Sequence, residues 1–276
     1  MGTTQYDRTR DRLVMFNKAA TAEFWDSLWQ SDNLRKQIEL ESANSFYVAQ
    51  TQRVLPANPD TRVLDAGCGR GAVVLSHARA GYDAYGIDFA AQTIDAARQL
   101  YPELKLSVAD VRQLPFEDNF FSAYWSLGVI EHFYDGYQEV IVEARRVIKP
   151  GGFLLITFPH LSGLRKLKIS LRAYEQFDSP ASAPINFYQF ALNYRKVLHE
   201  LQQLGFELRY RRSLDGLKGL NDEVAALRPL IKTILHSRSR LIQMSGAALS
   251  EAFAPVAGHI VLLVLQLDKS AASADV

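Results

Sequence analysis

A short glycine-rich segment, residues 63–71 with the sequence VLDAGCGRG, most constrains what this chain can fold into. Val63 and Leu64 are apolar residues of the kind that form a buried strand, and Asp65 marks the end of that strand. The three glycines that follow have no Cβ, so the backbone can turn sharply and come close to a ligand. A helix predicted over residues 72–80 would point its N-terminal amides at the same place. The segment therefore predicts a strand, a ligand-binding turn and a helix in succession.

Two classes of cofactor-binding protein use such a turn. Gly67, Gly69 and Ala72 satisfy the permissive G-x-G-x-x-A fingerprint of dinucleotide-binding proteins. Asp88 follows Gly67 by 21 residues, near the spacing of an acid that binds a ribose. The same segment, with an acid two residues before its first glycine, resembles the first motif of the class I S-adenosylmethionine-dependent methyltransferases. The turn by itself leaves both interpretations open.

Acidic residues also end two further predicted strands. Residues 82–87 (YDAYGI) form a short apolar strand closed by Asp88, and residues 104–109 (LKLSVA) form another closed by Asp110. The carboxyl ends of parallel strands share one edge of an open sheet, so Asp65, Asp88 and Asp110 should line one crevice. Three carboxylates accommodate a sulfonium and an amino group far better than a pyrophosphate. This pattern favours S-adenosylmethionine over a dinucleotide.

Later segments resemble the same methyltransferase family in the same order. Residues 109–133 resemble its adenine-binding acid, L-P-F loop and fourth strand, and residues 146–159 (RVIKPGGFLLITFP) resemble its K-P-G-G turn and fifth strand. Residues 187–210 indicate a helix and a sixth strand, and residues 258–267 (GHIVLLVLQL) the last strand. The resemblance covers about residues 61–210 plus that strand. A dehydrogenase would also need its own acid or base and a hydride-acceptor site, and the sequence contains no recognisable one.

The resemblance implies an α/β fold with a Rossmann-like sheet of seven strands in the order 3-2-1-4-5-7-6, the last of them antiparallel. Apolar residues at helical spacing, Phe16, Ala20 and Phe24, predict helices before the first core strand. The expected regions are an N-terminal helical lid (1–58), the methyltransferase core (59–212 plus 256–268), an inserted helical cap (213–255) and a flexible tail (269–276).

The resemblance also assigns roles at the cofactor site. It places Asp65 and the glycine turn at the methionine end of the cofactor, Asp88 at the ribose hydroxyls and Asp110 at the adenine edge. Tyr6 and Trp25 of the lid are expected to contact cofactor or acceptor. The full set of implied cofactor-binding residues is Asp65, Ala66, Gly67, Gly69, Asp88, Phe89, Asp110, Val111 and Leu127.

A catalytic base is needed only if the acceptor atom must lose a proton, as in a phenol, an alcohol or an activated carbon. His132 and His160 are the candidates, because each follows a predicted strand at the ligand edge, with a structural role as the alternative for both. Cys68 is expected to be a small residue tolerated in the turn, because no activating base stands beside it. Side chains with metal-ligand spacing do not occur, so we expect no metal.

Charge is unevenly spread along a chain whose net charge is +1. Residues 161–240 contain 14 Lys and Arg against 7 Asp and Glu. Within them, residues 164–174 (LRKLKISLRAY) and 224–241 are typical of amphipathic helices with basic residues beside an apolar stripe. Such helices either cover the sheet with a solvated basic face or rest on an anionic membrane or a lipid-like acceptor. We do not expect nucleic acid as a partner, because no RNA-binding module is visible.

The sequence thus predicts methyl transfer from S-adenosylmethionine, with S-adenosylhomocysteine as product, to a small organic acceptor, hydrophobic or lipid-linked. The alternatives are a methyltransferase of RNA or protein, an NAD(P)-dependent oxidoreductase and a non-catalytic cofactor-binding protein. The single cysteine, together with the lack of a signal-peptide core and of an apolar run long enough to span a bilayer, predicts a cytoplasmic protein. Association with a membrane through the basic helices is the second expectation. The acceptor atom and the oligomeric state do not follow from the sequence.

Overall fold

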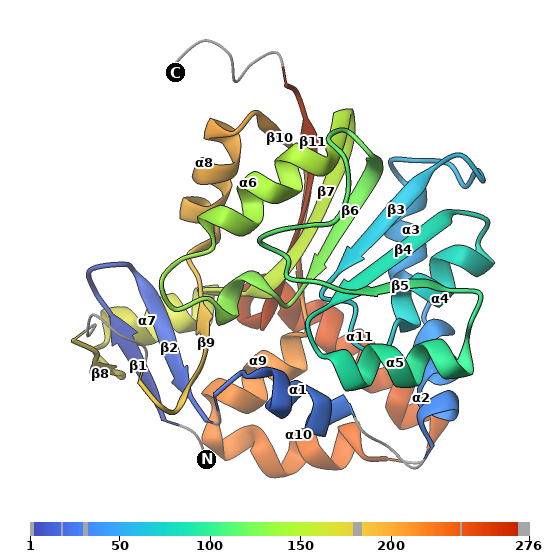
Figure 1. The fold of residues 1–276 in the computed structure, drawn as a ribbon. Coiled ribbons are helices and arrows are strands. Elements are labelled where there is room, and N and C mark those ends of the chain that lie inside the picture. The colour runs from blue at the N-terminus through green and yellow to red at the C-terminus, as the bar shows by residue number, and fades with distance from the viewer. Residues whose placement is uncertain (1–2, 18, 30–32, 179–183, 238, 270–276) are drawn as a thin grey trace.

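A seven-stranded sheet forms the core of the computed structural model, which describes residues 3–17, 19–29, 33–178, 184–237 and 239–269 (Figure 1). The predicted flexible tail lies outside the described residues, apart from Lys269. The strands of the core are β3 (Arg62–Ala66), β4 (Asp83–Asp88), β5 (Lys105–Val108), β6 (Phe121–Leu127), β7 (Ile148–Pro159), β10 (Phe206–Leu214) and β11 (Ile260–Leu267).

The strand order across this sheet is β10-β11-β7-β6-β3-β4-β5. Numbered by their place in the core and taken from the β5 edge, the strands follow the order 3-2-1-4-5-7-6. The strands from β3 to β7 pair in parallel, and β11 is antiparallel to both of its neighbours. The predicted fold class and strand order are confirmed. The carboxyl ends of the parallel strands therefore lie at one edge of the sheet, as the functional prediction requires.

Successive side chains of a strand point to opposite faces of the sheet. Both faces of this sheet carry buried apolar side chains, and helices cover both. On β6, Tyr124 packs on the side of α6 and α8, whereas Trp125 packs on the side of α3. Trp125 is fully buried, and its Nε1 donates a 2.9 Å hydrogen bond to Thr51 of α3. The helices of the core are α2 (Leu34–Ser42), α3 (Phe46–Gln52), α4 (Ala72–Arg79), α5 (Ala91–Leu100), α6 (Gln138–Val147) and α8 (Tyr194–Gln203).

The N-terminal segment differs from the helical lid that the sequence predicts. It begins with a hairpin of β1 (Thr4–Asp7) and β2 (Arg12–Phe16), and α1 (Ala22–Trp29) follows. The hairpin joins β8 (Glu175–Gln176) and β9 (Phe187–Ala191) in a second sheet of order β8-β1-β2-β9. The residues of β9 were expected to be helical. Long-range pairing overrides local pattern here, because the partner strands come from distant parts of the chain.

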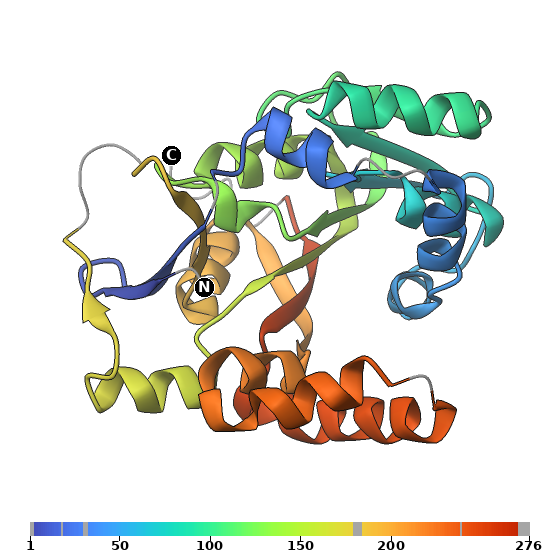
Figure 2. The ribbon, with the colours of Figure 1, turned by 90° about the horizontal axis from the view of Figure 1, so that it is seen from below.

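A helical layer fills the stretch between β10 and β11. It consists of α9 (Gly216–Glu223), the short 3₁₀ turn η2 (Ala225–Leu227), α10 (Arg228–Leu235) and α11 (Arg240–Ala257). Pro229 lies in the first turn of α10, where its missing N–H leaves no helical hydrogen bond unmade. Figure 2 shows α7 (Gly163–Ser170) beside these helices. Among the described helices, none combines the length and apolarity that crossing a bilayer requires.

Three residues in and just after α7 differ in burial from what the sequence pattern predicts. Arg165, expected on the solvated side, is fully buried, whereas Leu167 and Leu171, expected to pack inward, are exposed. Arg165 Nε lies 2.8 Å from a carboxylate oxygen of Glu223 in α9, and its Nη1 donates to the carbonyl of His160. A buried guanidinium is tolerated only with such partners. The ion pair with α9 therefore accounts for the burial of Arg165.

The crossing of α9 and α11 predicts a large effect of one methyl group. A Cβ at Gly219 would overlap the carbonyl oxygen of Ala257, a backbone atom that cannot rotate away. We expect Gly219→Ala to lower the free energy of unfolding by at least the ~1–3 kcal/mol typical of an overpacked core. Urea unfolding followed by circular dichroism measures this effect. Gly163→Ala is the control, because Gly163 is exposed, has no positive φ, and its Cβ position lies no closer than 3.2 Å to any neighbouring atom. Equal losses in the two variants would contradict the steric argument.

Candidate functional site

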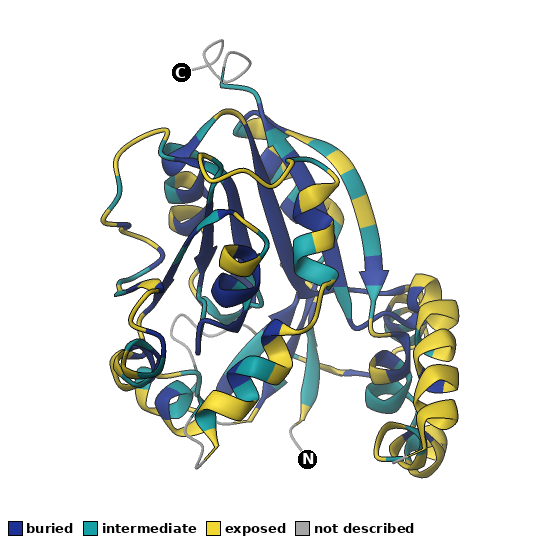
Figure 3. Ribbon diagram, turned by 90° about the vertical axis from the view of Figure 1, so that its right-hand side faces the viewer, coloured by how far each residue is buried: buried dark blue, intermediate teal, exposed yellow. Residues whose placement is uncertain are grey.

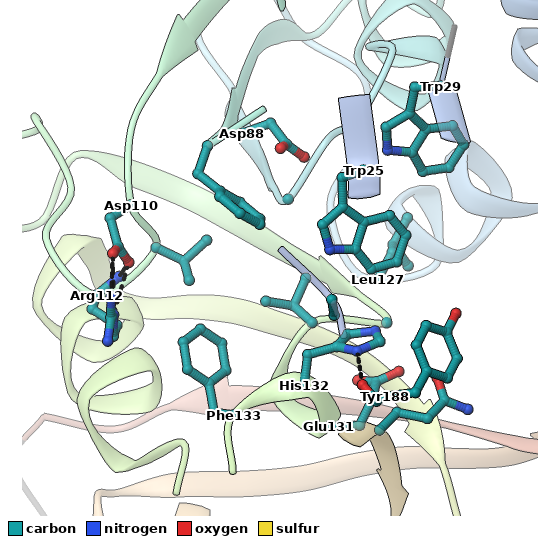
Figure 4. A pocket seen from close by; sticks show the side chains of 17 residues that line it. Trp25, Trp29, Asp88, Asp110, Arg112, Leu127, Glu131, His132, Phe133 and Tyr188 are labelled. Atoms are coloured by element: carbon teal, nitrogen blue, oxygen red, sulfur yellow. Dashed lines mark hydrogen bonds and ion pairs between the residues drawn. The ribbon is translucent and has the colours of Figure 1, made fainter. Parts of the chain in front are cut away.

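A cavity of about 440 Å³ lies at the carboxyl ends of the parallel strands (Figure 4). The turn after β3, the ends of β4 and β6, helix α1 and strand β9 all contribute to its wall. Its lining is mostly apolar and aromatic, with a few charged side chains. The residues that line it are Ala20, Trp25, Trp29, Gly67, Asp88, Phe89, Asp110, Val111, Arg112, Leu127, Gly128, Val129, Glu131, His132, Phe133, Tyr188 and Gln189.

The glycine turn has the backbone conformation that its sequence indicates. Gly67, Gly69 and Gly71 have φ angles of 88°, 48° and 77°, in the left-handed region that glycine adopts most readily. The amide of Gly67 donates a 2.8 Å hydrogen bond to the carbonyl of Ile87, which ties the turn to β4. A Cβ at Gly67 would lie 2.6 Å from a methyl group of Val129. This turn therefore needs glycine for both its conformation and its close packing.

Asp88 organises the turn as well as facing the cavity. One of its carboxylate oxygens accepts a 2.8 Å hydrogen bond from the amide of Gly69, and the other accepts a 2.9 Å bond from the amide of Ala90. Burial raises the pKa of Asp88, and these backbone amides oppose that rise. Each carboxylate oxygen has a second lone pair. Asp88 can therefore accept two further donors from a ligand while it holds the turn.

Asp65 is buried behind the cavity and is not part of its lining. Burial, together with the neighbouring carboxylate of Asp88, raises the pKa of Asp65 to about 7. Its Oδ1 has no hydrogen-bond partner in the structure. Burial also raises the pKa of the Cys68 thiol, so this thiol is protonated at neutral pH and is not an activated nucleophile.

Asp110 lines the cavity but is paired with a residue that the sequence analysis did not single out. Arg112 Nη2 lies 2.6 Å from a carboxylate oxygen of Asp110, and the two side chains are about half exposed. This hydrogen-bonded ion pair lowers the pKa of Asp110. The Arg112 guanidinium also lies 5.5 Å from the ring centre of Phe133. The Asp110 carboxylate therefore stays ionised, and the Asp110–Arg112 pair forms part of the cavity wall.

Helix α1 places two tryptophans over the glycine turn. The Trp29 ring lies 3.1–3.4 Å from the Cβ position of Gly69, and the Trp25 ring stacks on Trp29 with centroids 6.1 Å apart. Asp26, on the same helix, accepts hydrogen bonds of 2.9 and 2.8 Å from the amide and hydroxyl of Thr93. This buried anchor attaches α1 to α5. Trp25, predicted to contact cofactor or acceptor, therefore lies at the cavity.

His132 has a defined tautomer at the cavity wall. Its Nδ1 lies 2.8 Å from the carbonyl oxygen of Tyr188, which can only accept, so Nδ1 carries the hydrogen. Nε2 is then left with a free lone pair. Burial lowers the pKa of His132 from 6.5, and the ring packs edge-on against Trp25 with centroids 5.2 Å apart. A neutral imidazole with an available nitrogen thus faces the aromatic part of the cavity (Figure 4).

The other two side chains expected at the site lie elsewhere. His160 is buried, with no hydrogen-bond partner on either ring nitrogen, and burial is the main cause that lowers its pKa to about 3. Tyr6 lies on β1, where its hydroxyl donates a 2.8 Å hydrogen bond to Asp11. Neither residue lines the cavity. Their positions depend on the turn after β7 and on the second sheet, which the sequence pattern did not reveal, so we assign neither to the site.

Glu131 is a further acidic group of the cavity, and it lies beside His132 on the 3₁₀ turn η1 (Ile130–His132). Its side chain is buried, and its Oε2 has no hydrogen-bond partner. Burial raises the pKa of Glu131 from 4.5 to about 8. Its carboxyl group is therefore protonated and neutral at pH 7.

The raised pKa of Glu131 predicts a specific pH dependence of stability. The folded state binds this proton more tightly than the unfolded chain, so the stabilisation is complete below pH 4.5 and is lost as pH rises through about 8. Glu131→Gln carries no such proton. We expect its free energy of unfolding, relative to the unsubstituted protein, to increase from pH 5 to pH 8 in urea titrations. Glu117→Gln, at an exposed site, is the control. Parallel curves for Glu131→Gln and the unsubstituted protein would refute the assignment.

Comparison with known proteins identifies the family of this domain. Residues 64–156 match the family model described as "Methyltransferase domain". A malonyl-[acyl-carrier protein] O-methyltransferase of Enterobacter lignolyticus is 30% identical over 122 residues, which cover 44% of this chain and 48% of that enzyme. The chain thus matches about half the length of that relative. The enzyme of the same name from Erwinia billingiae is 26% identical over 220 residues, covering 80% of this chain and 82% of that enzyme.

A solved structure has the same fold. The geranyl diphosphate C-methyltransferase of Streptomyces coelicolor, determined in complex with Mg²⁺, geranyl diphosphate and S-adenosylhomocysteine, superposes with a TM-score of 0.50 at 16% identity, covering 92% of this chain and 90% of that one. The family match, the sheet order and the glycine turn agree with one another. The chain thus contains a methyltransferase domain over residues 64–156 and is similar to S-adenosylmethionine-dependent methyltransferases.

Proposed function

We propose that this protein transfers a methyl group from S-adenosylmethionine to a small organic acceptor of hydrophobic or lipid-linked character. The observation that carries this proposal is the cavity at the glycine turn, because the Asp88 carboxylate and the neutral His132 imidazole both line it. The cofactor supplies an electrophilic methyl group on a sulfonium. The contribution of the protein is then to align two reactants and to exclude water, and orientation alone can lower a barrier by several kcal/mol.

The residues at the cavity fit this cofactor. The unpartnered buried Oδ1 of Asp65 is an acceptor of the kind that an ammonium group needs. Asp88 keeps lone pairs for two ribose hydroxyls, and the anionic site suits a cation. We assign the methionine end to Asp65, Ala66, Gly67, Gly69 and the carbonyl of Leu127, and the ribose to Asp88. We assign the adenine to Phe89, Asp110 and Val111.

His132 is the base that we assign to the reaction. Its Nε2 lone pair can take a proton from an acceptor hydroxyl or activated carbon, while Nδ1 stays bonded to the Tyr188 carbonyl. The electron pair of the deprotonated acceptor atom would then form the bond to the methyl group as the methyl–sulfur bond breaks, and that bond's electron pair would stay on the sulfur of the departing S-adenosylhomocysteine. Burial keeps the imidazole neutral at pH 7, so it is ready to accept that proton. A neutral amine acceptor would not need this step.

The aromatic character of the cavity supports a hydrophobic acceptor. Trp25, Phe133 and Tyr188 line it together with Val129 and Leu127. Apolar walls with a few polar groups are typical of sites for small organic ligands. Two relatives are named as O-methyltransferases of malonyl-[acyl-carrier protein], and the solved structure is that of a geranyl diphosphate C-methyltransferase, so proteins similar to this chain are named for a carrier-linked and for a hydrocarbon-based acceptor.

Methyl-labelled S-adenosylmethionine, incubated with the protein and with fractionated cell extract, tests the proposal. We expect label in an organic-soluble fraction, where mass spectrometry identifies the product. Label in acid-precipitable RNA or protein would replace the small acceptor by a macromolecule. Tight cofactor binding with no labelled fraction would indicate a non-catalytic protein, and calorimetric binding of a nicotinamide dinucleotide instead would indicate an oxidoreductase.

A further inference from the structure

The outer surface of α10 and α11 is apolar. Six large side chains, Leu230, Leu235, Leu241, Met244, Phe253 and Val256, are 43–76% exposed there, and we call them the cap face. Figure 3 shows that these two helices are exposed along most of their length. Large exposed apolar surfaces on globular proteins mark interaction sites.

The packing of α11 is the reverse of that in an ordinary amphipathic helix. Its buried residues are the small ones, Gly246, Ala254 and Ala257. A Cβ at Gly246 would lie 2.7 Å from a methyl group of Ile234, so the interior has no room for larger side chains. The large apolar residues of α11 are therefore on the outside, where core packing does not account for them.

The charge of this segment has one sign. Residues 224–250 contain no Asp or Glu, and they contain Arg228, Lys232, Arg238 and Arg240. Lys232 and Arg240 are exposed, whereas Arg238 lies outside the described residues. The next acid along the chain, Glu251, is paired with Arg212 of β10. The cap face is thus apolar, and the exposed cations Lys232 and Arg240 lie on the same two helices.

We propose that the cap face docks on the surface of an anionic lipid bilayer. Helices that lie in the bilayer interface insert apolar side chains at the acyl boundary and keep basic side chains among anionic headgroups. A second copy of this chain fits less well, because the acid of α11, Glu251, is already paired with Arg212 and a two-fold interface would offer Lys232 and Arg240 no other acid from residues 224–257. The occupant that matches both the apolar surface and its charge is a negatively charged membrane.

A further cavity lies between the cap helices and the methyltransferase site. This cavity of about 450 Å³ is lined by Lys218 and Asn221 of α9 and by Arg228 of α10. It shares Tyr188 and Gln189 with the cofactor cavity. The docking proposal does not rest on the proposed function.

Vesicle cosedimentation tests the docking. We expect the protein to sediment with phosphatidylcholine vesicles that contain phosphatidylglycerol, to remain in solution with pure phosphatidylcholine, and to dissociate as salt is raised. Lys232→Gln and Arg240→Gln should each weaken binding about fivefold, which corresponds to the ~1 kcal/mol of one basic residue near an anionic surface. The combined variant Leu241→Glu, Met244→Glu, Phe253→Glu should lose binding.

Controls separate docking from folding and from catalysis. Leu40→Glu and Val142→Glu change residues of α2 and α6 that are 66% and 52% exposed, and they should sediment like the unsubstituted protein. Thermal unfolding and cofactor calorimetry should be unchanged in the triple variant.

Sedimentation unaffected by the triple change would overturn the proposal. So would a dimer in analytical ultracentrifugation that Leu241→Glu dissociates, because the cap face would then bind a second copy. Cosedimentation without methyl transfer would leave docking standing and refute the proposed function alone.

Discussion

Replacing Asp88 by alanine should abolish detectable binding of S-adenosylmethionine while the core of the protein stays folded. The carboxylate accepts hydrogen bonds from the amides of Gly69 and Ala90, and its remaining lone pairs are assigned to the ribose. Hydrogen bonds to a charged group contribute about 1.5–3 kcal/mol each. Loss of two ligand bonds, together with a loosened glycine turn, lowers the affinity by a hundredfold or more. Isothermal titration calorimetry measures this effect directly.

Two further variants identify the cause of that loss. Asp95→Ala, at an exposed carboxylate of α5, should bind the cofactor normally. Asp88→Asn keeps one acceptor oxygen and the shape of the side chain, so its affinity should lie between those of the unsubstituted protein and Asp88→Ala. Thermal unfolding of each variant shows whether the core is intact. Unchanged affinity of a folded Asp88→Ala protein would remove the ribose assignment.

Replacing His132 by asparagine should lower kcat by about a hundredfold to ten-thousandfold, the range for loss of a general base. The amide group of asparagine can still donate to the Tyr188 carbonyl, so the local turn should be retained, but no nitrogen is left to take a proton. Cofactor affinity should change little, because His132 is assigned to the acceptor. Methyl transfer to the acceptor found in extract, followed with labelled cofactor, gives the rate.

The pH profile separates a base from a merely structural histidine. Protonation of Nε2 removes the base, so the rate of the unsubstituted protein should fall on the acid side, and burial sets that fall below pH 6.5. His132→Asn should lack this acid limb. His199→Asn, at an exposed site on α8, should keep both the rate and the limb. An identical acid limb in His132→Asn would assign it to another group, and an unchanged rate would show that the acceptor needs no base.

The cofactor half of the site was predictable because it is built from local signals. The glycine turn and the acids at the ends of β3, β4 and β5 lie within one stretch of chain, and parallel strands bring their carboxyl ends to one edge. The cofactor roles of Asp65, Asp88 and Asp110 stay predictions. The burial of Asp65 and the pairing of Asp110 with Arg112 were not foreseen, because neither depends on residue spacing.

The part of the cavity that we assign to the acceptor, around His132 and Tyr188, was not predictable in the same way. The carbonyl of Tyr188 in β9 sets the tautomer of His132. Strand β9 pairs with β2, which lies near the start of the chain. The periodicity of the N-terminal segment favours a helix, yet its first residues form strands because partners exist only in the folded protein. Arg165 shows the same limit, since its burial depends on Glu223 in a different helix.

The amino-acid sequence by itself indicated the core strands, the glycine turn and the strand-end acids, because these signals act over a few residues, whereas the strand order and the cofactor class came from the resemblance to a methyltransferase family. Only the tertiary structure decided which histidine faces the cavity, how α1 covers the turn and which side of α11 meets solvent. Those outcomes depend on packing between segments far apart in the chain, where sterics and the burial of charge select one arrangement from several that the local pattern allows.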